Sequence, residues 1–327
     1  MIKTSNFKPA WWLSNTHAQT MFPALTKRKK PPITQFERLE LPDGDFIDLA
    51  WAAPKHLNPN TPLVILLHGL GGSLNSSYVA RQLKAYNLHG WRAVFMHFRG
   101  ASDTPNRLNR AYHSGETSDL NFVLNTLHQR APHTQKAVVG VSLGANVLLK
   151  WLGEQSAQSL IHAAIAISTP FDLALLATHM NQGFPRIYQR HLIQSLRELF
   201  NKKLKQYPEE LAPYLKKMNS LHSFWEFDEH ITAPLYGFSN AETYYRESSS
   251  RQFLKHIQTP TLILHAKDDP FMPAHAIPLP HELSSDITLE LSAKGGHVGF
   301  ISGAIPGKPI YWLDQRTPLF LEPILNT

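Results

Sequence analysis

The pentapeptide Gly140-Val141-Ser142-Leu143-Gly144 (GVSLG) decides the fold because of the segments on each side of it. Residues 136–141 (KAVVGV) have the composition of a short buried strand, and residues 143–154 (LGANVLLKWLGE) that of a helix. A G-x-S-x-G pattern on such a junction forms a nucleophile elbow, a tight turn that strains the serine backbone. Glycine is needed at both ends of the pentapeptide, where a side chain would collide. The pattern therefore predicts an exposed, reactive Ser142 hydroxyl at the edge of a sheet.

The composition is that of an ordinary globular protein with enough apolar residues for a large core. The chain has 327 residues, of which 43% are hydrophobic and 17% are charged. It has no cysteine, which excludes disulfides, thiolate metal sites and a cysteine nucleophile. It has neither an apolar run of about 18–20 residues nor the apolar core of a secretion signal. We therefore expect a soluble, cytoplasmic protein.

Most of the positive charge lies in residues 1–36, which we interpret as a basic N-terminal arm. This segment has six basic and no acidic residues, which accounts for +6 of the net charge of +7. Because it also carries Trp11, Trp12 and Leu13, two interpretations are open. The arm makes weak peripheral contact with an anionic membrane surface, or its tryptophans pack onto the body while its lysines stay solvated. No basic stripe with interleaved aromatic residues continues beyond it, so we expect no nucleic-acid binding.

Strands and helices alternate along the rest of the chain at the spacing of β-α-β units. This spacing predicts a mostly parallel sheet with helices on both faces. The predicted strands are residues 36–41, 45–51, 63–67, 92–98, 136–141, 163–168, 261–265 and 287–291, and the predicted helices are residues 78–88, 117–129 and 143–154. Pro42-Asp43-Gly44 predicts a hairpin turn between the first two strands.

One long segment interrupts this alternation. Residues 171–255 separate two predicted strands by 85 residues, too many for a single crossover helix. The segment is rich in helix-forming and aromatic residues. We interpret it as a helical cap inserted over the strand ends, with residues 37–170 and 256–327 forming the core. The alternative is an elaborated crossover that does not cover the site.

A serine hydroxyl is a poor nucleophile without a base, and the base needs an acid that fixes its tautomer. In proteins with such an elbow, the serine comes first in the sequence, the acid second and the base third. Asp268 and Asp269 follow the predicted strand 261–265, and of the two we select Asp269, four residues before Pro273. Asp268 is then a turn residue or a supporting acceptor. Asp172 is a third candidate for the acid.

The candidate base is His297, in the glycine-rich segment Lys294–Phe300 (KGGHVGF) after the last predicted strand. The flanking glycines allow this loop to bring an imidazole close to the serine. The chain has 18 histidines, so position decides the choice. His265, His275 and His281 lack this context, and we expect them to be structural or exposed.

A second glycine-rich segment, His68–Ser73 (HGLGGS), directly follows the buried strand 63–67. Where such a loop accompanies the elbow, one of its N–H groups and the N–H after the nucleophile hold the oxyanion. Leu70 and Leu143 are therefore the predicted donors. The alternative is a phosphate-binding loop, but neither G-x-x-x-x-G-K-[ST] nor G-x-G-x-x-G is present. We expect His68 to support the loop rather than to transfer protons.

Further motifs extend along nearly the whole chain. They are SNTHAQT (14–20), LELPDGDFIDLAW (39–51), HGLGGSLNS (68–76), MHFRGASDTPNR (96–107), YHSGETSDL (112–120), GVSLGANVL (140–148), HAKDDPFM (265–272) and GGHVGFISG (295–303). With these motifs the chain resembles the YheT family of α/β hydrolases, which is related to eukaryotic α/β-hydrolase-domain lipid esterases. The resemblance implies the α/β-hydrolase fold and a catalytic triad at Ser142, Asp269 and His297. It also implies hydrolysis of short- to medium-chain acyl esters or acylglycerols.

The residues alone do not explain the role of two of these motifs. Arg99 follows a strand end, where it either lines the mouth of the pocket or pairs with an acid. Residues 112–116 open a helix, with Ser114 and Thr117 as candidate caps. We expect a structural role for both motifs.

The sequence thus predicts a serine esterase that uses neither a metal nor a cofactor. Ser142 attacks an ester carbonyl, His297 takes its proton and Asp269 orients His297, while Leu70 and Leu143 hold the oxyanion. The expected partner is a small ester substrate. Two alternatives stay open: an acyltransferase of the same fold, and a binding protein without turnover.

Overall fold

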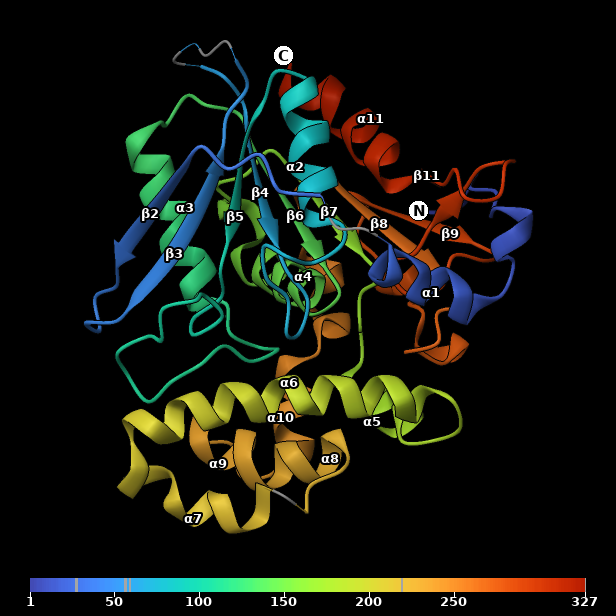
Figure 1. Ribbon diagram of the computed structural model, residues 1–327. Coiled ribbons are helices and arrows are strands. Elements are labelled where there is room, and N and C mark those ends of the chain that lie inside the picture. The colour runs from blue at the N-terminus through green and yellow to red at the C-terminus, as the bar shows by residue number, and fades with distance from the viewer. Residues whose placement is uncertain (27–28, 56–57, 59, 219, 327) are drawn as a thin grey trace.

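A twisted sheet forms the centre of the computed structural model, which describes all residues except 27–28, 56–57, 59, 219 and 327 (Figure 1). Within the described residues the sheet has nine strands in the order β1-β9-β8-β7-β6-β4-β5-β3-β2. The strands are β1 (Ile2–Thr4), β2 (Gln35–Glu40), β3 (Phe46–Ala52), β4 (Leu63–Leu67), β5 (Arg92–Met96), β6 (Lys136–Val141), β7 (Ala163–Ile167), β8 (Thr261–Ala266) and β9 (Ile287–Ser292). All neighbours from β1 to β5 in this order run parallel, and only the pairs β2–β3 and β3–β5 are antiparallel. The mostly parallel sheet expected from the sequence is confirmed.

All eight predicted strands are present, with ends that differ from the prediction by at most two residues. The predicted hairpin turn joins β2 to β3, and Gly44 has φ +86°, a value that favours glycine. The sequence analysis missed β1, which pairs with β9 at the edge of the sheet.

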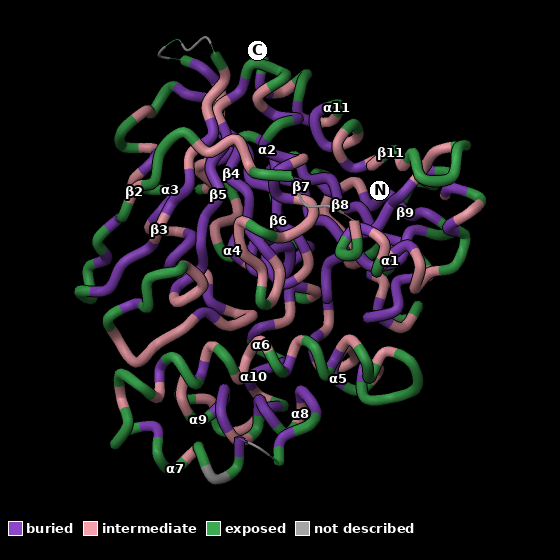
Figure 2. The backbone as a smooth tube through the Cα atoms, viewed as in Figure 1, coloured by how far each residue is buried: buried purple, intermediate pink, exposed green. Residues whose placement is uncertain are grey.

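The central strands are apolar throughout because both faces of the sheet are covered. The flanking helices are α2 (Val79–Leu88), α3 (Ser118–Arg130), α4 (Leu143–Gln155) and α11 (Leu313–Leu325). Along β4, the side chains of Leu63, Ile65 and Leu67 join the core under α3 and α4. Those of Val64 and Leu66 join the core under α2 and α11. Each of the two faces therefore has its own hydrophobic core. Figure 2 shows the central strands as mostly buried.

Helices fill the long segment between β7 and β8. They are α5 (Leu173–Met180), α6 (Pro185–Gln206), α7 (Pro208–Met218), α8 (Phe224–Phe227), α9 (Ala233–Tyr236) and α10 (Ala241–Ser248). A π-helical turn, Asp228–Thr232, connects α8 to α9. In Figure 1 these helices form a layer beyond the lower ends of the central strands, with the long α6 next to the sheet.

The N-terminal segment packs against the C-terminal part of the chain. It contains helix α1 (Thr16–Leu25), and the ring of Phe7 contacts the rings of Phe300 and Trp312. Beside it lies a small antiparallel pair, β10 (Ile301–Ser302) and β11 (Ile310–Tyr311). None of the helices in the described residues combines the length and the apolar character that crossing a bilayer would require.

Candidate active site

The predicted site residues gather at the carboxyl ends of parallel strands. Ser142 follows β6, Asp269 follows β8, His297 follows β9, and the loop that carries Leu70 follows β4. Since β4, β6, β8 and β9 all run in one direction, these four segments leave the sheet at the same edge. Ligand sites of open α/β sheets lie at this edge.

Ser142 lies in a strained turn between β6 and α4. Its φ and ψ angles are 54° and −118°, a combination that residues with a Cβ atom rarely adopt. A Cβ on Gly140 would lie 2.5 Å from the carbonyl oxygen of Gly144, and one on Gly144 would lie 2.5 Å from that of His68. The predicted steric reason for both glycines is confirmed.

The ring of His297 bridges Ser142 and Asp269. Its Nε2 lies 2.9 Å from the Oγ of Ser142, and its Nδ1 lies 2.8 Å from Oδ2 of Asp269. Because a carboxylate only accepts hydrogen bonds, Nδ1 carries the proton and Nε2 of the neutral ring accepts from the serine hydroxyl. The other oxygen of Asp269 accepts the N–H of Phe271 at 2.8 Å, and the Phe271 ring stacks on the imidazole at 3.8 Å. The imidazole is therefore fixed in both position and orientation.

The other two candidate acids have different contacts. Asp268 accepts the N–H of Gly296 at 3.0 Å, next to His297, and burial raises the pKa of its carboxyl. Asp172 caps helix α5 by accepting the N–H of Leu175 at 2.9 Å. The carboxylate that contacts the imidazole is that of Asp269.

None of the other three histidines considered takes the place of His297 in this contact. His265 is buried, and burial lowers its pKa. His275 and His281 are exposed. Their locations agree with the structural or exposed positions expected from the sequence.

The loop after β4 passes close to the serine. A Cβ on Gly69 would lie 3.1 Å from the Cβ of Ser142, a tight contact, so the loop backbone passes very close to the nucleophile. Leu70 and Leu143 both line the cavity that Ser142 also lines. Leu143 is the first residue of α4, where an N–H has no acceptor within the helix.

His68 supports this loop from behind. Its Nδ1 lies 2.7 Å from the carbonyl oxygen of Gly69, and its Nε2 lies 3.2 Å from the N–H of Phe98. Burial lowers the pKa of His68 to about 3, so the ring is neutral near pH 7. A neutral ring donates from Nδ1 and accepts at Nε2. Both nitrogens are thus engaged with backbone groups, as expected for a supporting residue.

Two tyrosines that the sequence analysis did not single out as partners of this loop also hold it. The N–H of Gly71 donates to the hydroxyl of Tyr112 at 2.8 Å, and that of Gly69 donates to the hydroxyl of Tyr78 at 3.3 Å. Burial raises the pKa of the Tyr112 hydroxyl to about 12, so the group is neutral near pH 7. Tyr112 belongs to a motif for which the residues alone gave no mechanism.

Helix α1 holds the loop that carries His297. The N–H of His297 donates to Oγ1 of Thr20 at 3.0 Å, and a Cβ on Gly296 would lie 2.6 Å from the same oxygen. Gln19 is fully buried, and its Oε1 accepts the N–H of Ile301 at 2.7 Å. The sequence analysis missed both roles, although Gln19 and Thr20 belong to the SNTHAQT motif.

The two tryptophans of the N-terminal arm contact the body through their indole N–H groups. Trp11 donates to the carbonyl of Ala304 and Trp12 donates to that of Gly303. Packing of this part of the arm onto the body, one of the two interpretations, is thus present. The Trp11 side chain is nevertheless 69% exposed, and Lys27 and Arg28 lie outside the described residues. Peripheral membrane contact stays a prediction.

Replacing Thr20 by valine tests whether α1 positions the base. The variant keeps the shape of the side chain but leaves the N–H of His297 without its acceptor. An unpaired buried N–H costs about 1–3 kcal/mol, so we expect kcat for ester hydrolysis to fall roughly tenfold with little change in KM. Thr126→Val is the matched control, since Thr126 makes the same hydrogen bond to the carbonyl four residues earlier but lies on α3. An unchanged kcat for Thr20→Val would contradict this role.

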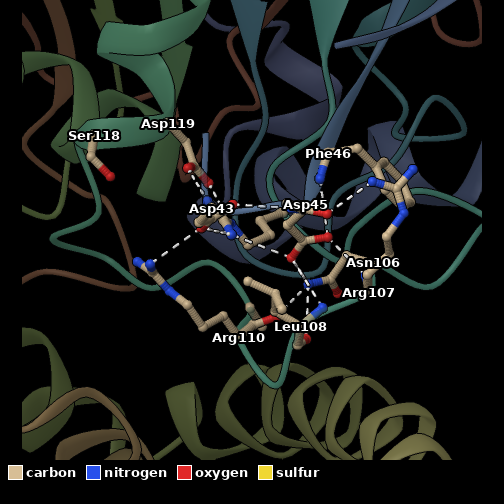
Figure 3. Close-up of polar contacts among 12 residues, drawn as sticks. Asp43, Asp45, Phe46, Asn106, Arg107, Leu108, Arg110, Ser118 and Asp119 are labelled. Atoms are coloured by element: carbon tan, nitrogen blue, oxygen red, sulfur yellow. Dashed lines mark hydrogen bonds and ion pairs between the residues drawn. The ribbon is translucent and has the colours of Figure 1, made fainter. Parts of the chain in front are cut away.

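Arg99 pairs with acids, one of the two roles considered for it. Figure 3 labels these acids, Asp43, Asp45 and Asp119. Its Nε and Nη2 donate to both oxygens of Asp119 at 3.0 and 2.6 Å. Its Nη1 donates to Asp43 at 2.6 Å and to Asp45 at 3.3 Å. Arg99 is only 3% exposed and Asp45 is fully buried. We call these four residues the Arg99 cluster; it ties the β2–β3 hairpin to α3.

The loop between β5 and α3 connects the Arg99 cluster to helix α6. Asn106 donates to Asp45 at 2.6 Å, and the backbone N–H of Arg107 donates to the same carboxylate at 2.7 Å. On the other side, Nζ of Lys203 on α6 donates to the carbonyls of Asn106 and Leu108 at 2.8 and 2.7 Å. The loop is therefore held from both sides.

Of the two candidate caps of α3, Thr117 is confirmed in position but makes no capping bond. Its hydroxyl donates to Glu154 instead. A carboxylate replaces it, because Oε1 of Glu116 accepts the N–H of Ser118 at 2.9 Å. The backbone N–H of Ser114 donates to the hydroxyl of Tyr244 on α10 at 3.0 Å, which ties this segment to the helical layer.

A cavity of about 450 Å³ opens beside Ser142 and His297. This volume lies within the range of sites for small molecules, about 300–1,000 Å³. Its wall is largely apolar, and the helical layer contributes Leu173, Ala177, Met180, Leu196, Phe200 and Phe227 to it. Among the described residues, no group of three or more His, Cys, Asp or Glu side chains is arranged to hold a metal ion.

Comparisons with known proteins show the family of this chain. Residues 62–304 match the family described as the alpha/beta hydrolase fold. The chain is 42% identical to the Escherichia coli (strain K12) protein named "Putative esterase YheT", over 99% of this chain and 95% of that protein. It is 27% identical to the Mus musculus protein named "Phospholipase ABHD3", over 99% of this chain and 80% of that protein.

A similar fold occurs among solved structures. The Pyrococcus furiosus esterase Pf2001 superimposes with a TM-score of 0.55 at 16% sequence identity, over 91% of this chain and 99% of that one. At this level of identity the likeness concerns the fold alone.

Proposed function

This chain belongs to the α/β hydrolase fold family, and we propose that it is a serine hydrolase that cleaves carboxylic esters with Ser142, His297 and Asp269. The observation that carries the proposal is the bridging imidazole, 2.9 Å from the serine oxygen and 2.8 Å from the carboxylate. These are the contacts that a base needs to activate a hydroxyl near neutral pH. The relatives named as an esterase and a phospholipase support the same class of reaction.

Acylation begins with the attack of Ser142 Oγ on the ester carbonyl, while Nε2 of His297 takes the hydroxyl proton. The carbonyl oxygen becomes an oxyanion, which the N–H groups of Leu70 and Leu143 stabilise. Asp269 stabilises the imidazolium through its bond to Nδ1–H. The imidazolium then gives its proton to the departing alkoxide, which leaves as the alcohol, and the acyl group stays on Ser142.

Deacylation repeats these steps with water in place of the serine. His297 takes a proton from water, the resulting hydroxide attacks the acyl carbonyl, and the proton returns to Ser142 as the carboxylic acid leaves. An added alcohol would resolve the same intermediate by acyl transfer, which is the acyltransferase alternative. Transfer to added alcohols, measured against hydrolysis in plain buffer, separates the two reactions.

The largely apolar cavity favours a substrate with an apolar acyl group. We infer that residues 171–255 act as a cap, because α5, α6 and α8 supply apolar side chains to the same cavity that Ser142 lines. An alkyl chain gains about 0.8 kcal/mol for each methylene group that it buries. Short- to medium-chain acyl esters and acylglycerols are the substrates proposed on this basis.

A series of p-nitrophenyl esters tests the proposal. We expect kcat/KM to rise by roughly fourfold per methylene until the chain fills the cavity, and then to fall within the range of two to twelve carbons. Ser142→Ala is the control for hydrolysis that does not involve the site. A folded wild-type protein that turns over none of these esters would contradict the proposal and favour a binding protein.

A further inference from the structure

A buried carboxylate lies in the wall of the substrate cavity, in the helical layer rather than in the core. Asp228 begins the π-helical turn between α8 and α9, and it lines the cavity together with Thr232 of the same turn and Tyr245 of α10. Figure 1 shows α8, α9 and α10 gathered in this part of the layer. π-Helical turns are rare and occur frequently at functional sites, so Asp228 is a candidate functional residue.

Two hydroxyl groups are the side-chain partners of the Asp228 carboxylate among the described residues. Thr232 Oγ1 donates to Oδ1 at 2.5 Å, and the Tyr245 hydroxyl donates to Oδ2 at 2.7 Å. Burial raises the pKa of Asp228 to about 6, and only these two hydrogen bonds oppose the shift. In the described part of the chain, no basic side chain forms an ion pair with it. Buried charged groups in proteins are usually paired with an opposite charge. Among the described residues, the Asp228 carboxylate has no such partner.

The site has unused hydrogen-bonding capacity. Each carboxylate oxygen offers two lone pairs, and the two protein hydroxyls occupy one on each. The cavity wall is mostly apolar and includes Phe224, Phe227 and Tyr244, while Arg110 and Lys203 also line it. In a mostly apolar cavity, a small number of polar groups fix the orientation of a ligand.

We propose that Asp228, with Thr232 and Tyr245, binds a hydrogen-bond donor of the substrate, a hydroxyl or an ammonium group remote from the scissile ester. The inference rests on the proposed function, because it concerns the cavity that Ser142 lines. It narrows the substrate class from simple alkyl esters to esters that carry such a donor. An analogue without the donor leaves the carboxylate without its third partner, and sites of this kind discriminate strongly against such analogues.

Paired esters measure this selectivity. Each p-nitrophenyl alkanoate of four to twelve carbons is compared with counterparts that carry a terminal hydroxyl or a terminal ammonium. For at least one chain length, we expect wild-type kcat/KM to be about tenfold higher for a donor-bearing ester than for its plain counterpart. In Asp228→Asn this ratio should fall to about one, and in Tyr245→Phe it should change, because that variant alters the carboxylate's hydrogen bonds without removing it. The hydroxyl and ammonium arms identify which donor is bound.

Asp172→Asn is the matched control. Asp172 lies in the same helical segment but caps α5, and asparagine is an equally good cap, so the ratio should stay at its wild-type value. A ratio near one at every chain length in the wild type would overturn the proposal. So would a tenfold ratio that survives in Asp228→Asn.

A binding measurement separates this proposal from the proposed function. Calorimetry compares octane-1,8-diol and octane-1,8-diamine with octan-1-ol, none of which can be hydrolysed. Tighter binding of the diol or diamine to the wild type, lost in Asp228→Asn, supports the donor site even if no ester is turned over. Equal binding of all three compounds would overturn the donor site and leave the esterase proposal untouched.

Discussion

Ser142→Ala and His297→Ala are each expected to lower kcat for a p-nitrophenyl ester by about 10⁴- to 10⁶-fold. Without the serine oxygen no acyl-enzyme forms. Without the imidazole at 2.9 Å nothing takes the hydroxyl proton in the transition state. Because the two groups act as one unit, the double variant should be no slower than the slower single variant. Steady-state and single-turnover kinetics on the purified variants measure all three values.

The exposed His275 provides the control for this prediction. His275→Ala removes an imidazole that does not contact the site, and its kcat should stay near the wild-type value. A His297→Ala variant that keeps more than about one hundredth of the wild-type rate would contradict the assignment of the base. Additive losses in the double variant would contradict the shared mechanism.

Arg99→Met is expected to lower the free energy of unfolding by about 3–5 kcal/mol. The substitution leaves Asp45 and Asp119 buried, close together and without the cation that pairs with them. In the intact cluster Arg99 holds the pKa of Asp43 below its usual value against the effect of burial. Without the guanidinium, the folded protein must bury unpaired negative charge or take up protons. Urea denaturation followed by circular dichroism measures the loss.

Arg38→Met is the matched control for burial. Arg38 also donates through two nitrogens to both oxygens of one aspartate, Asp48, at 2.8 and 3.0 Å. Its side chain is 37% exposed, however, so the pair contributes about 1 kcal/mol or less. A similar small loss for Arg99→Met would contradict the account of the Arg99 cluster.

The loss of stability in Arg99→Met should depend on pH. In Arg99→Met, Asp43 and Asp119 lose the guanidinium that lowers their pKa values, so the variant is least stable where these carboxylates are ionised. As the pH falls toward the ordinary carboxyl range they take up protons, and the deficit relative to the wild type should shrink. A deficit that is independent of pH would point to lost packing instead.

The local features of the fold could be predicted from the sequence because each depends on neighbouring residues. The strand β6, the strained Ser142 and the start of α4 follow from one apolar run and two glycines. The continuous apolar run of β4 indicated a strand covered on both faces. For these elements the periodicity of the chain and its turn residues are sufficient.

The contacts that support the site could not be predicted, since they join distant segments. Thr20 and His297 are 277 residues apart, and nothing in the periodicity of either segment indicates that they meet. Helix α1 was missed because a basic, tryptophan-bearing segment with Pro23 inside the helix resembles an irregular arm. Asn15, whose side chain caps α1 by accepting two backbone N–H groups, was the available signal.

The partners of Arg99 depend on how the β2–β3 hairpin folds toward α3. The sequence showed the turn that carries Asp43 but gave no reason why a buried arginine should face it. Likewise, Asp228 stood in a helical segment without a motif, and only the cavity and the π-helical turn single it out. Tertiary packing, not local preference, creates these sites.

Labelling with a fluorophosphonate probe, mapped by mass spectrometry, tests the central claim most directly, namely that the His297–Asp269 pair makes Ser142 a reactive nucleophile. The account predicts one probe adduct per wild-type chain, located on Ser142, and no adduct in folded His297→Ala. A folded wild-type protein that stays unlabelled, or one that is labelled at another residue, would contradict it.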